Sequence, residues 1–93
     1  MILRVYAVMD RAVRAFNVPM TYRSDDEAAR SFSEAVAQEG TQFNKYAADY
    51  SLFFLGLYDD NLGVFENASG GPALLLNGVN VGSKANLLVV DAE

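Results

Sequence analysis

Arginines that alternate with aromatic residues near the start of the chain are the best candidates for a chemical function. Arg4 and Tyr6 share one face of a predicted strand, and Arg14 and Phe16 share a face of the next segment. A guanidinium group neutralises phosphate, and a flat ring stacks on an unpaired base for about 1–3 kcal/mol. The pattern therefore predicts contact with single-stranded nucleic acid; the alternative is a solvated face that keeps a small sheet from aggregating. The candidate contact residues are Arg4, Tyr6, Arg11, Arg14, Tyr22 and Arg23.

Charge is unevenly distributed along the 93 residues. The formal net charge is −5, yet the first 24 residues hold four arginines against one aspartate, and residues 46–93 hold one lysine against six acids. A basic segment can act within a Debye length of roughly 8–10 Å even in an acidic protein. The acidic second half instead favours a protein interface. Both interpretations stay open at this point.

The composition excludes most catalytic chemistry. The chain contains no cysteine and no histidine, which rules out thiolate and imidazole metal sites, disulfides and histidine acid–base catalysis. The only carboxylate cluster that could suggest a metal site or an acid–base pair, Asp59-Asp60 with Asp49 upstream, precedes Asn61 and Gly63 and is typical of a tight turn. The glycines lack the lysine and hydroxyl residues of a phosphate-binding loop. We therefore expect no enzymatic activity, no metal and no cofactor, and a small carboxylate enzyme is a distant alternative.

A helix over about residues 25–39 is predicted between two groups of strands. Ser24 followed three residues later by Glu27 is typical of a capping box, in which Glu27 bonds back to the Ser24 N–H. Apolar residues then recur at helical spacing, and Gly40 supplies a C-terminal stop. This helix should pack closely on a sheet because its apolar face is narrow and rich in alanine.

The rest of the chain favours strands. Alternation before and after Asp10 predicts a hairpin over residues 2–18, and the apolar run from Tyr50 to Tyr58 predicts a central strand. A turn at residues 59–63 leads to a returning strand at 64–66. Residues 67–72 are predicted to be a loop, and residues 74–79, with Asn77-Gly78 as the turn, a further short hairpin.

The expected fold class is α+β: a single small domain with an antiparallel sheet of about four to five strands and one helix packed on it, in β-β-α-β-β order. Residues 1–66 would form the core, and residues 67–93 a short hairpin or loosely ordered C-terminal extension of the same domain. Such a chain builds only a modest core, so we expect a homodimer formed through a sheet edge or through the apolar tail. The apolar runs are too short for a bilayer, and no membrane partner is expected.

One stretch of the chain resembles a viral family. The pattern comprises Phe43, Asp49-Tyr50, Leu52, Leu55-Gly56, Tyr58-Asp59-Asp60 and Gly63. It is similar to that of the small non-structural protein of gokushoviruses, which are single-stranded DNA bacteriophages of the Microviridae. The resemblance covers roughly residues 3–66, and it departs from the family at Ala47, where proline is usual.

The resemblance implies a non-structural DNA-binding protein of the host bacterial cytoplasm. Its expected role is in genome replication, or in the switch towards synthesis of single-stranded DNA, and it brings no catalytic residues with it. The main alternative is a non-enzymatic adaptor that recruits a host or phage replication protein through its acidic half.

Overall fold

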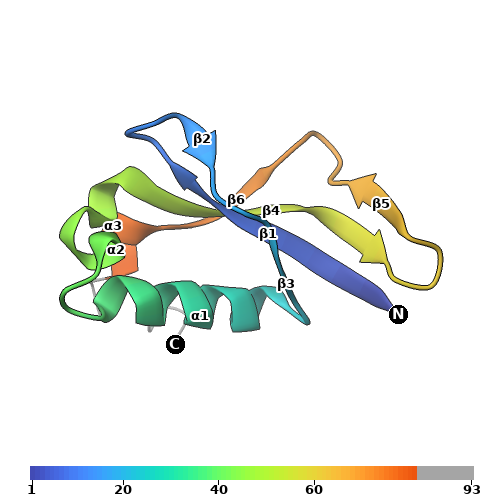
Figure 1. Ribbon diagram of the computed structural model, residues 1–93, viewed down its shortest axis with the longest axis horizontal. Coiled ribbons are helices and arrows are strands. Elements are labelled where there is room, and N and C mark those ends of the chain that lie inside the picture. Colours follow the sequence, from blue (N-terminus) through green and yellow to red (C-terminus); the bar gives the residue numbers. More distant parts are fainter. Residues whose placement is uncertain (82–93) are drawn as a thin grey trace.

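Two long antiparallel strands form the centre of the computed structural model, which describes residues 1–81 (Figure 1). β1 (Ile2–Asp10) pairs with β4 (Tyr50–Asp59) along its whole length. Two short strands, β2 (Ala15–Phe16) and β3 (Met20–Tyr22), pair with the outer edge of β1. Two more, β5 (Val64–Asn67) and β6 (Ala73–Asn77), pair with the outer edge of β4. All pairs are antiparallel.

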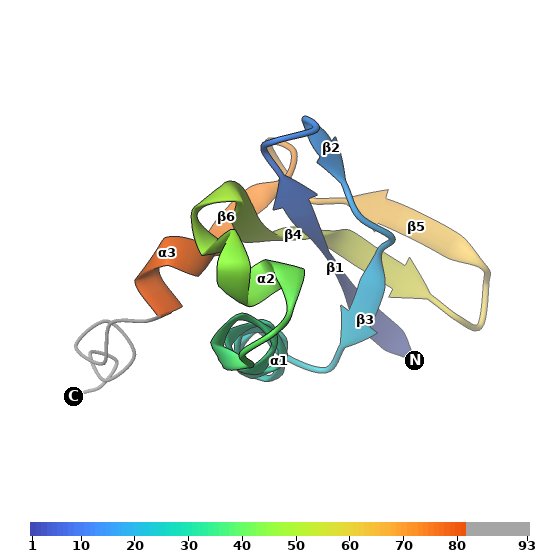
Figure 2. The ribbon, with the colours of Figure 1, turned by 60° about the vertical axis from the view of Figure 1, so that its left-hand side comes forward.

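Helical segments lie on one side of this sheet (Figure 2). The longest is α1 (Asp25–Ala37). The connector after it holds α2 (Gln42–Lys45) and a short 3₁₀ helix, η1 (Ala47–Asp49), and α3 (Gly78–Val81) follows β6. Among residues 1–81, no helix is long and apolar enough to cross a membrane.

The α+β class, the N-terminal hairpin and the central position of residues 50–58 are confirmed, but the predicted strand number and order are wrong. Residues 1–81 form six strands and three α-helices. The edge beside β1 is split in two because Pro19 has no N–H to donate to the ladder, so the strand stops after Phe16 and resumes at Met20. The edge beside β4 is split at residues 68–72, where Gly70 and Gly71 adopt positive φ.

The short hairpin predicted at residues 74–79 is also wrong. Asn77 pairs with Ser51 as the last residue of β6, and the chain then turns into α3. Gly78 is needed for close approach and not for a hairpin, because a Cβ there would collide with the carbonyl oxygen of Ala47. The part of the C-terminal extension beyond residue 81 lies outside the described residues.

The helix predicted after Ser24 is confirmed, with one change at its start. The Ser24 hydroxyl accepts a hydrogen bond from the N–H of Glu27 at 3.1 Å, as a capping residue should. The Glu27 carboxylate, however, accepts from the N–H of Arg23 and not from that of Ser24. α1 buries Ala28, Phe32 and Val36.

The core lies between α1 and one face of the sheet. Side chains alternate between the two faces along a strand, and Tyr6, Val8 and Leu52 project towards the helix and are almost fully buried with Phe32. The opposite face is covered by no helix of residues 1–81 and is called the helix-free face below. It carries Phe16 and Phe53 near the β1–β2 turn and Tyr58 and Phe65 near the β4–β5 turn.

A bulge in β4 lets the two long strands remain paired. Val5 pairs with Gly56 and the next residue, Tyr6, pairs with Phe54, so Leu55 has no partner on β1. Gly56 has a φ of 150° and lies against the backbone of β5, which agrees with the close packing expected for a glycine inside a central strand.

Candidate nucleic-acid interface

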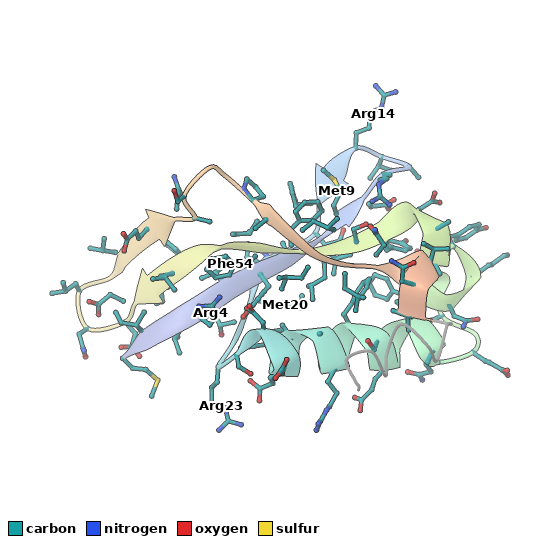
Figure 3. All side chains as sticks on the ribbon, turned by 180° about the vertical axis from the view of Figure 1, so that it is seen from behind. Arg4, Met9, Arg14, Met20, Arg23 and Phe54 are labelled. Atoms are coloured by element: carbon teal, nitrogen blue, oxygen red, sulfur yellow. The ribbon has the colours of Figure 1, made fainter. Side chains whose placement is uncertain are left out.

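The first pair of predicted contact residues, Arg4 and Tyr6, lies on the helix side of the sheet. The Tyr6 hydroxyl donates to a carboxylate oxygen of Asp25 at 2.6 Å, and the Arg4 Nη2 donates to the same oxygen at 2.9 Å. The Arg4 guanidinium also lies over the ring of Phe54, 4.3 Å from its centroid (Figure 3). Tyr6 is 0% exposed, so its ring offers no face to a base. The stacking role predicted for Tyr6 does not fit this position.

Asp25 holds this cluster together as an ionised group. The hydrogen bond from the Tyr6 hydroxyl lowers the pKa of Asp25 most, and partial burial opposes that shift; the hydrogen bond and positive charge of Arg4 lower the pKa further. The carboxylate is therefore charged at neutral pH and neutralises Arg4. The cluster fixes β1 against the start of α1.

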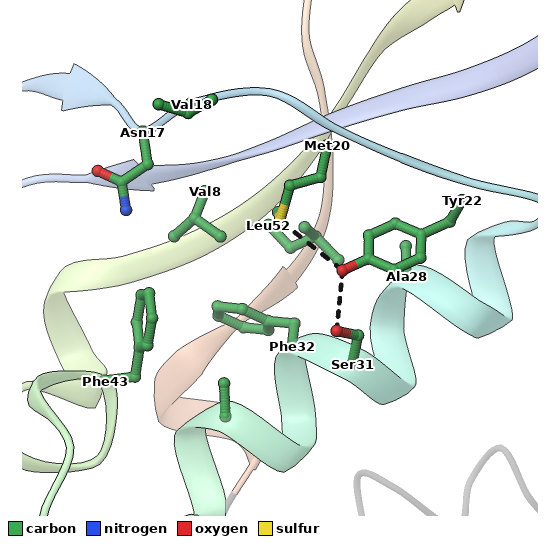
Figure 4. A pocket seen from close by; sticks show the side chains of 11 residues that line it. Val8, Asn17, Val18, Met20, Tyr22, Ala28, Ser31, Phe32, Phe43 and Leu52 are labelled. Carbon is green, nitrogen blue, oxygen red and sulfur yellow. Dashed lines mark hydrogen bonds between the residues drawn. The ribbon is translucent and has the colours of Figure 1, made fainter.

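The second pair, Tyr22 and Arg23, leads into the helix. The Tyr22 hydroxyl lies 2.8 Å from the Ser31 hydroxyl, and its ring lines a cavity of about 110 Å³ between β3 and α1 (Figure 4). Arg23 is exposed, but its Nη2 lies 3.0 Å from the Glu27 carboxylate. Asp25 and Asp26 follow two and three residues later in the chain. Arg23 thus sits in an acidic neighbourhood that disfavours phosphate.

Arg11 and Arg14 lie in the turn between β1 and β2. Arg11 donates to the carbonyl oxygen of Ala48 at 3.1 Å and to Oδ1 of Asn77 at 2.9 Å. Arg14 adopts a φ of 60° and points into solvent, on the opposite side of the molecule from Arg23 (Figure 3). Neither forms a salt bridge with any carboxylate of residues 1–81. Arg11 is thus held by two neutral acceptors, whereas no described residue accepts a hydrogen bond from the side chain of Arg14.

Two aromatic rings that were not predicted as contact residues lie beside this turn. Phe16 is 38% exposed, and its ring meets that of Phe53 edge-on with centroids 5.4 Å apart. Phe53 belongs to the apolar run that predicts a central strand, and strand alternation places it on the helix-free face beside Ala7. The one signal for these rings in the sequence was that Arg14 and Phe16 stand two residues apart and so fall on the same face of a strand. Arg11, Arg14, Phe16 and Phe53 together are called the basic–aromatic patch below.

The helix-free face carries no acidic residue at its paired strand positions within the described part of the chain. Asp10, Asp59 and Glu66 all occupy the positions of β1, β4 and β5 that project towards the helix side. The positions that project the other way are Leu3, Val5, Ala7, Met9, Phe16, Thr21, Ser51, Phe53, Gly56, Tyr58, Phe65, Asn67, Leu74 and Asn77. The paired strand positions therefore put no carboxylate on this face, although the Asp10 carboxylate accepts a hydrogen bond from the N–H of Ala12 at 3.0 Å and so lies in the turn that carries Arg11 and Arg14.

The carboxylates at residues 59–60 have structural roles. Asp59 accepts hydrogen bonds from the N–H groups of Asn61 and Leu62, which confirms the turn interpretation, and Asp60 lies 2.8 Å from the N-terminal amino group. Across residues 1–81, no three acidic side chains gather into a group that could hold a metal ion.

Comparison with known proteins gives one family match. A family model described as Phage ORF5 protein matches residues 3–81, which is most of the chain. No curated protein and no solved structure matches.

Proposed function

Because the chain belongs to the Phage ORF5 protein family and is therefore a phage protein, we propose that it binds single-stranded DNA in the cytoplasm of the host bacterium. It acts there as a non-structural, non-enzymatic protein of genome replication, or of the switch towards synthesis of single-stranded DNA. The resemblance of residues 3–66 to the gokushovirus protein supports the Microviridae origin and this role.

The basic–aromatic patch carries the proposal. Arg11 and Arg14 form no salt bridge with a described carboxylate, although that of Asp10 caps the same turn, and Phe16 presents part of its ring beside this turn. Single-stranded DNA needs this combination, since its backbone is anionic and its bases expose flat apolar faces. The paired strand positions of the helix-free face are free of acidic residues.

The other predicted contact residues take different roles in this proposal. Arg4 and Tyr6 support the strand beneath the patch through Asp25. Tyr22 packs against α1, and Arg23 belongs to the helix start. DNA contact therefore depends on Arg11 and Arg14, and much less on the remaining four residues.

Fluorescence anisotropy with labelled single- and double-stranded oligonucleotides at several salt concentrations tests this function. The wild-type protein should prefer single strands. Each phosphate contact contributes about −0.7 to the log–log salt slope, so the double variant Arg11→Ala/Arg14→Ala should flatten the slope by about 1.4. Phe16→Leu keeps an apolar side chain but removes the flat ring, and should weaken binding roughly 5- to 100-fold with the slope unchanged.

The matched control is Arg30→Ala/Lys45→Ala, which removes the same charge from exposed positions on the helix side. It should leave the slope close to that of the wild type. An equal loss in both double variants would mean that only net charge matters, and would overturn the assignment to the patch.

A protein adaptor is the second candidate, and the acidic net charge favours it. Absence of binding at low salt would overturn the DNA proposal. Retention of a host or phage replication protein after nuclease treatment, lost on neutralising Asp59 and Asp60 with asparagine, would then support the adaptor.

A further inference from the structure

Ser51 is the one polar side chain that is fully buried in the described part of the chain. It is 0% exposed and lies near the start of the apolar strand β4. Burying a hydroxyl is costly unless it finds a hydrogen-bond partner. The Ser51 hydroxyl donates to Oδ1 of Asn77, the last residue of β6, at 2.6 Å. A polar pair of this kind inside an apolar sheet calls for a reason.

The same oxygen of Asn77 also accepts a hydrogen bond from Arg11. The Nη2 of Arg11 lies 2.9 Å from it. An arginine can only donate, and a carbonyl oxygen has two lone pairs, so the two donors together fill the hydrogen-bonding capacity of Oδ1. They also determine which way the amide points, because its NH₂ group would face two donors if it were turned round. Ser51 therefore fixes the side chain of Asn77, and Asn77 fixes that of Arg11.

A second acceptor holds the Arg11 guanidinium from the neighbouring element. The Nη1 of Arg11 donates to the carbonyl oxygen of Ala48, in η1, at 3.1 Å. This oxygen lies close to Asn77 because Gly78 lets the end of β6 approach η1 until its backbone meets the carbonyl oxygen of Ala47. Two acceptors from separate elements hold the planar group at both of its Nη atoms, which restricts its rotation.

Both acceptors are neutral, which distinguishes Arg11 from the arginines near α1. Arg4 and Arg23 each form a salt bridge with a carboxylate. Arg11 forms none with residues 1–81; the adjacent Asp10 carboxylate accepts a hydrogen bond from the N–H of Ala12 instead. Neutral acceptors orient a guanidinium without cancelling its charge. Three of the five N–H groups of this exposed side chain have no acceptor among residues 1–81.

We propose that Asn77, supported by Ser51, is a positioning residue that presents the Arg11 guanidinium to a phosphate of single-stranded DNA. The inference rests on the proposed function and adds to it two residues that lie outside the basic–aromatic patch. A side chain that is already fixed loses less conformational freedom when it binds. Arg14, whose side chain has no described acceptor, is ordered only by the DNA.

Asn77→Asp separates positioning from support of the fold. An aspartate accepts the same two hydrogen bonds, so the midpoint of thermal unfolding should not fall. Its charge neutralises Arg11, however, and the salt slope for a single-stranded oligonucleotide should flatten by about 0.7, the contribution of one phosphate contact. An unchanged slope in a variant that binds DNA would overturn the role of Asn77.

The matched control is Asn67→Asp, which makes the same change at an exposed position of the same face. Asn67 pairs with Gly56 and Asn77 with Ser51, about 15 Å apart along β4. This separation exceeds a Debye length of about 8–10 Å, so the control should keep the wild-type slope. Equal flattening in both variants would mean that only net charge matters, and would overturn the proposal.

Asn77→Ala gives a second test, because it releases Arg11 but leaves its charge. The slope should stay unchanged, and the affinity should fall about 2- to 10-fold, since the guanidinium must then be ordered on binding. In an Arg11→Ala background the same substitution should cause no further loss. An equal loss of affinity in both backgrounds would show that Asn77 acts only through the fold.

Nitrogen-15 NMR of the arginine side chains tests the positioning without DNA. At low temperature the Nη atoms of Arg11 should give separate signals in the wild type and averaged signals in Asn77→Ala, whereas those of Arg14 should be averaged in both. Averaged Arg11 signals in the wild type would overturn the positioning role and leave the DNA-binding test unaffected. A wild type that binds no DNA at low salt would overturn the proposed function and this inference together.

Discussion

The shared oxygen of Asp25 joins a tyrosine and an arginine that the sequence had placed in a binding role. Tyr6 and Arg4 both donate to Oδ1 of this residue, and the Arg4 Nε also donates to the Tyr6 hydroxyl. Hydrogen bonds to a charged acceptor are stronger than those between neutral groups. The carboxylate thereby couples strand β1 to the first turn of α1.

Tyr6→Phe should lower the free energy of unfolding by about 1 kcal/mol at neutral pH, after allowing for the half-exposed carboxylate. The pKa of Asp25 is lowered in the folded state, so its contribution is present above the unfolded value near ~4 and lost as the pH falls through the folded value. The difference in the free energy of unfolding between the wild type and the variant should therefore narrow below pH ~4. Urea unfolding followed by circular dichroism over a pH series measures it.

Tyr22→Phe is the matched control, because its hydroxyl bonds to the neutral Ser31. Its effect should not change with acidification. A Tyr6→Phe deficit that is constant from neutral to acidic pH would show that Asp25 does not stabilise through this hydroxyl.

At the residue scale, strand alternation correctly placed Arg4 and Tyr6 on one face. It could not tell which face α1 covers, because both faces of β1 are rich in apolar residues, with Val5 and Ala7 on one and Tyr6 and Val8 on the other. Phe53 was missed for the same reason. Only the sheet register shows that it lies beside Phe16 and the turn that carries Arg14.

At the scale of the elements, Gly56 lets β5 continue beside the bulged part of β4. A Cβ at this position would overlap the carbonyl oxygen of Glu66, which belongs to the backbone and cannot move without displacing β5. The positive φ of 150° adds strain for any other residue. One glycine thus determines whether the edge strand forms.

Gly56→Ala should lower the free energy of unfolding by about 3 kcal/mol, from overpacking and backbone strain together. Gly40→Ala is the control: it has a φ of 89° but open space around it, and should lose only about 1 kcal/mol. Thermal or urea unfolding compares the two. Equal losses would mean that β5 adjusts freely around the new methyl group.

Local sequence signals predicted those elements whose start or turn is determined by residues next to them in the chain. Ser24 and the acids after it fixed the start of α1, and residues 59–63 fixed the turn before β5. The missed elements depend on distant partners. β3 is a strand because β1 offers a free edge, and Gly78 opens α3 because Ala47 lies against it, and neither partner is visible in the local sequence.

At the scale of the whole molecule, the sheet separates two surfaces. The basic–aromatic patch lies at one end of the helix-free face, and the β4–β5 turn with Tyr58 and Phe65 lies at the other. α1 and its acidic first turn occupy the opposite side. This separation lets an acidic chain present positive charge locally, at one end of the sheet.

The pairing of β1 with β4 also governs how the chain acquires its fold during translation. Ile2 pairs with Asp59 and Asp10 with Tyr50, so the central ladder joins two segments that leave the ribosome at well-separated times. The first three strands and α1 can pack together early. The edge of β1 that pairs with β4, however, stays unpaired until β4 has been synthesised. Closing so long a loop is slow compared with local pairing. The sheet is therefore completed only after β4 has been synthesised, and the edge of β1 that pairs with β4 stays open until then.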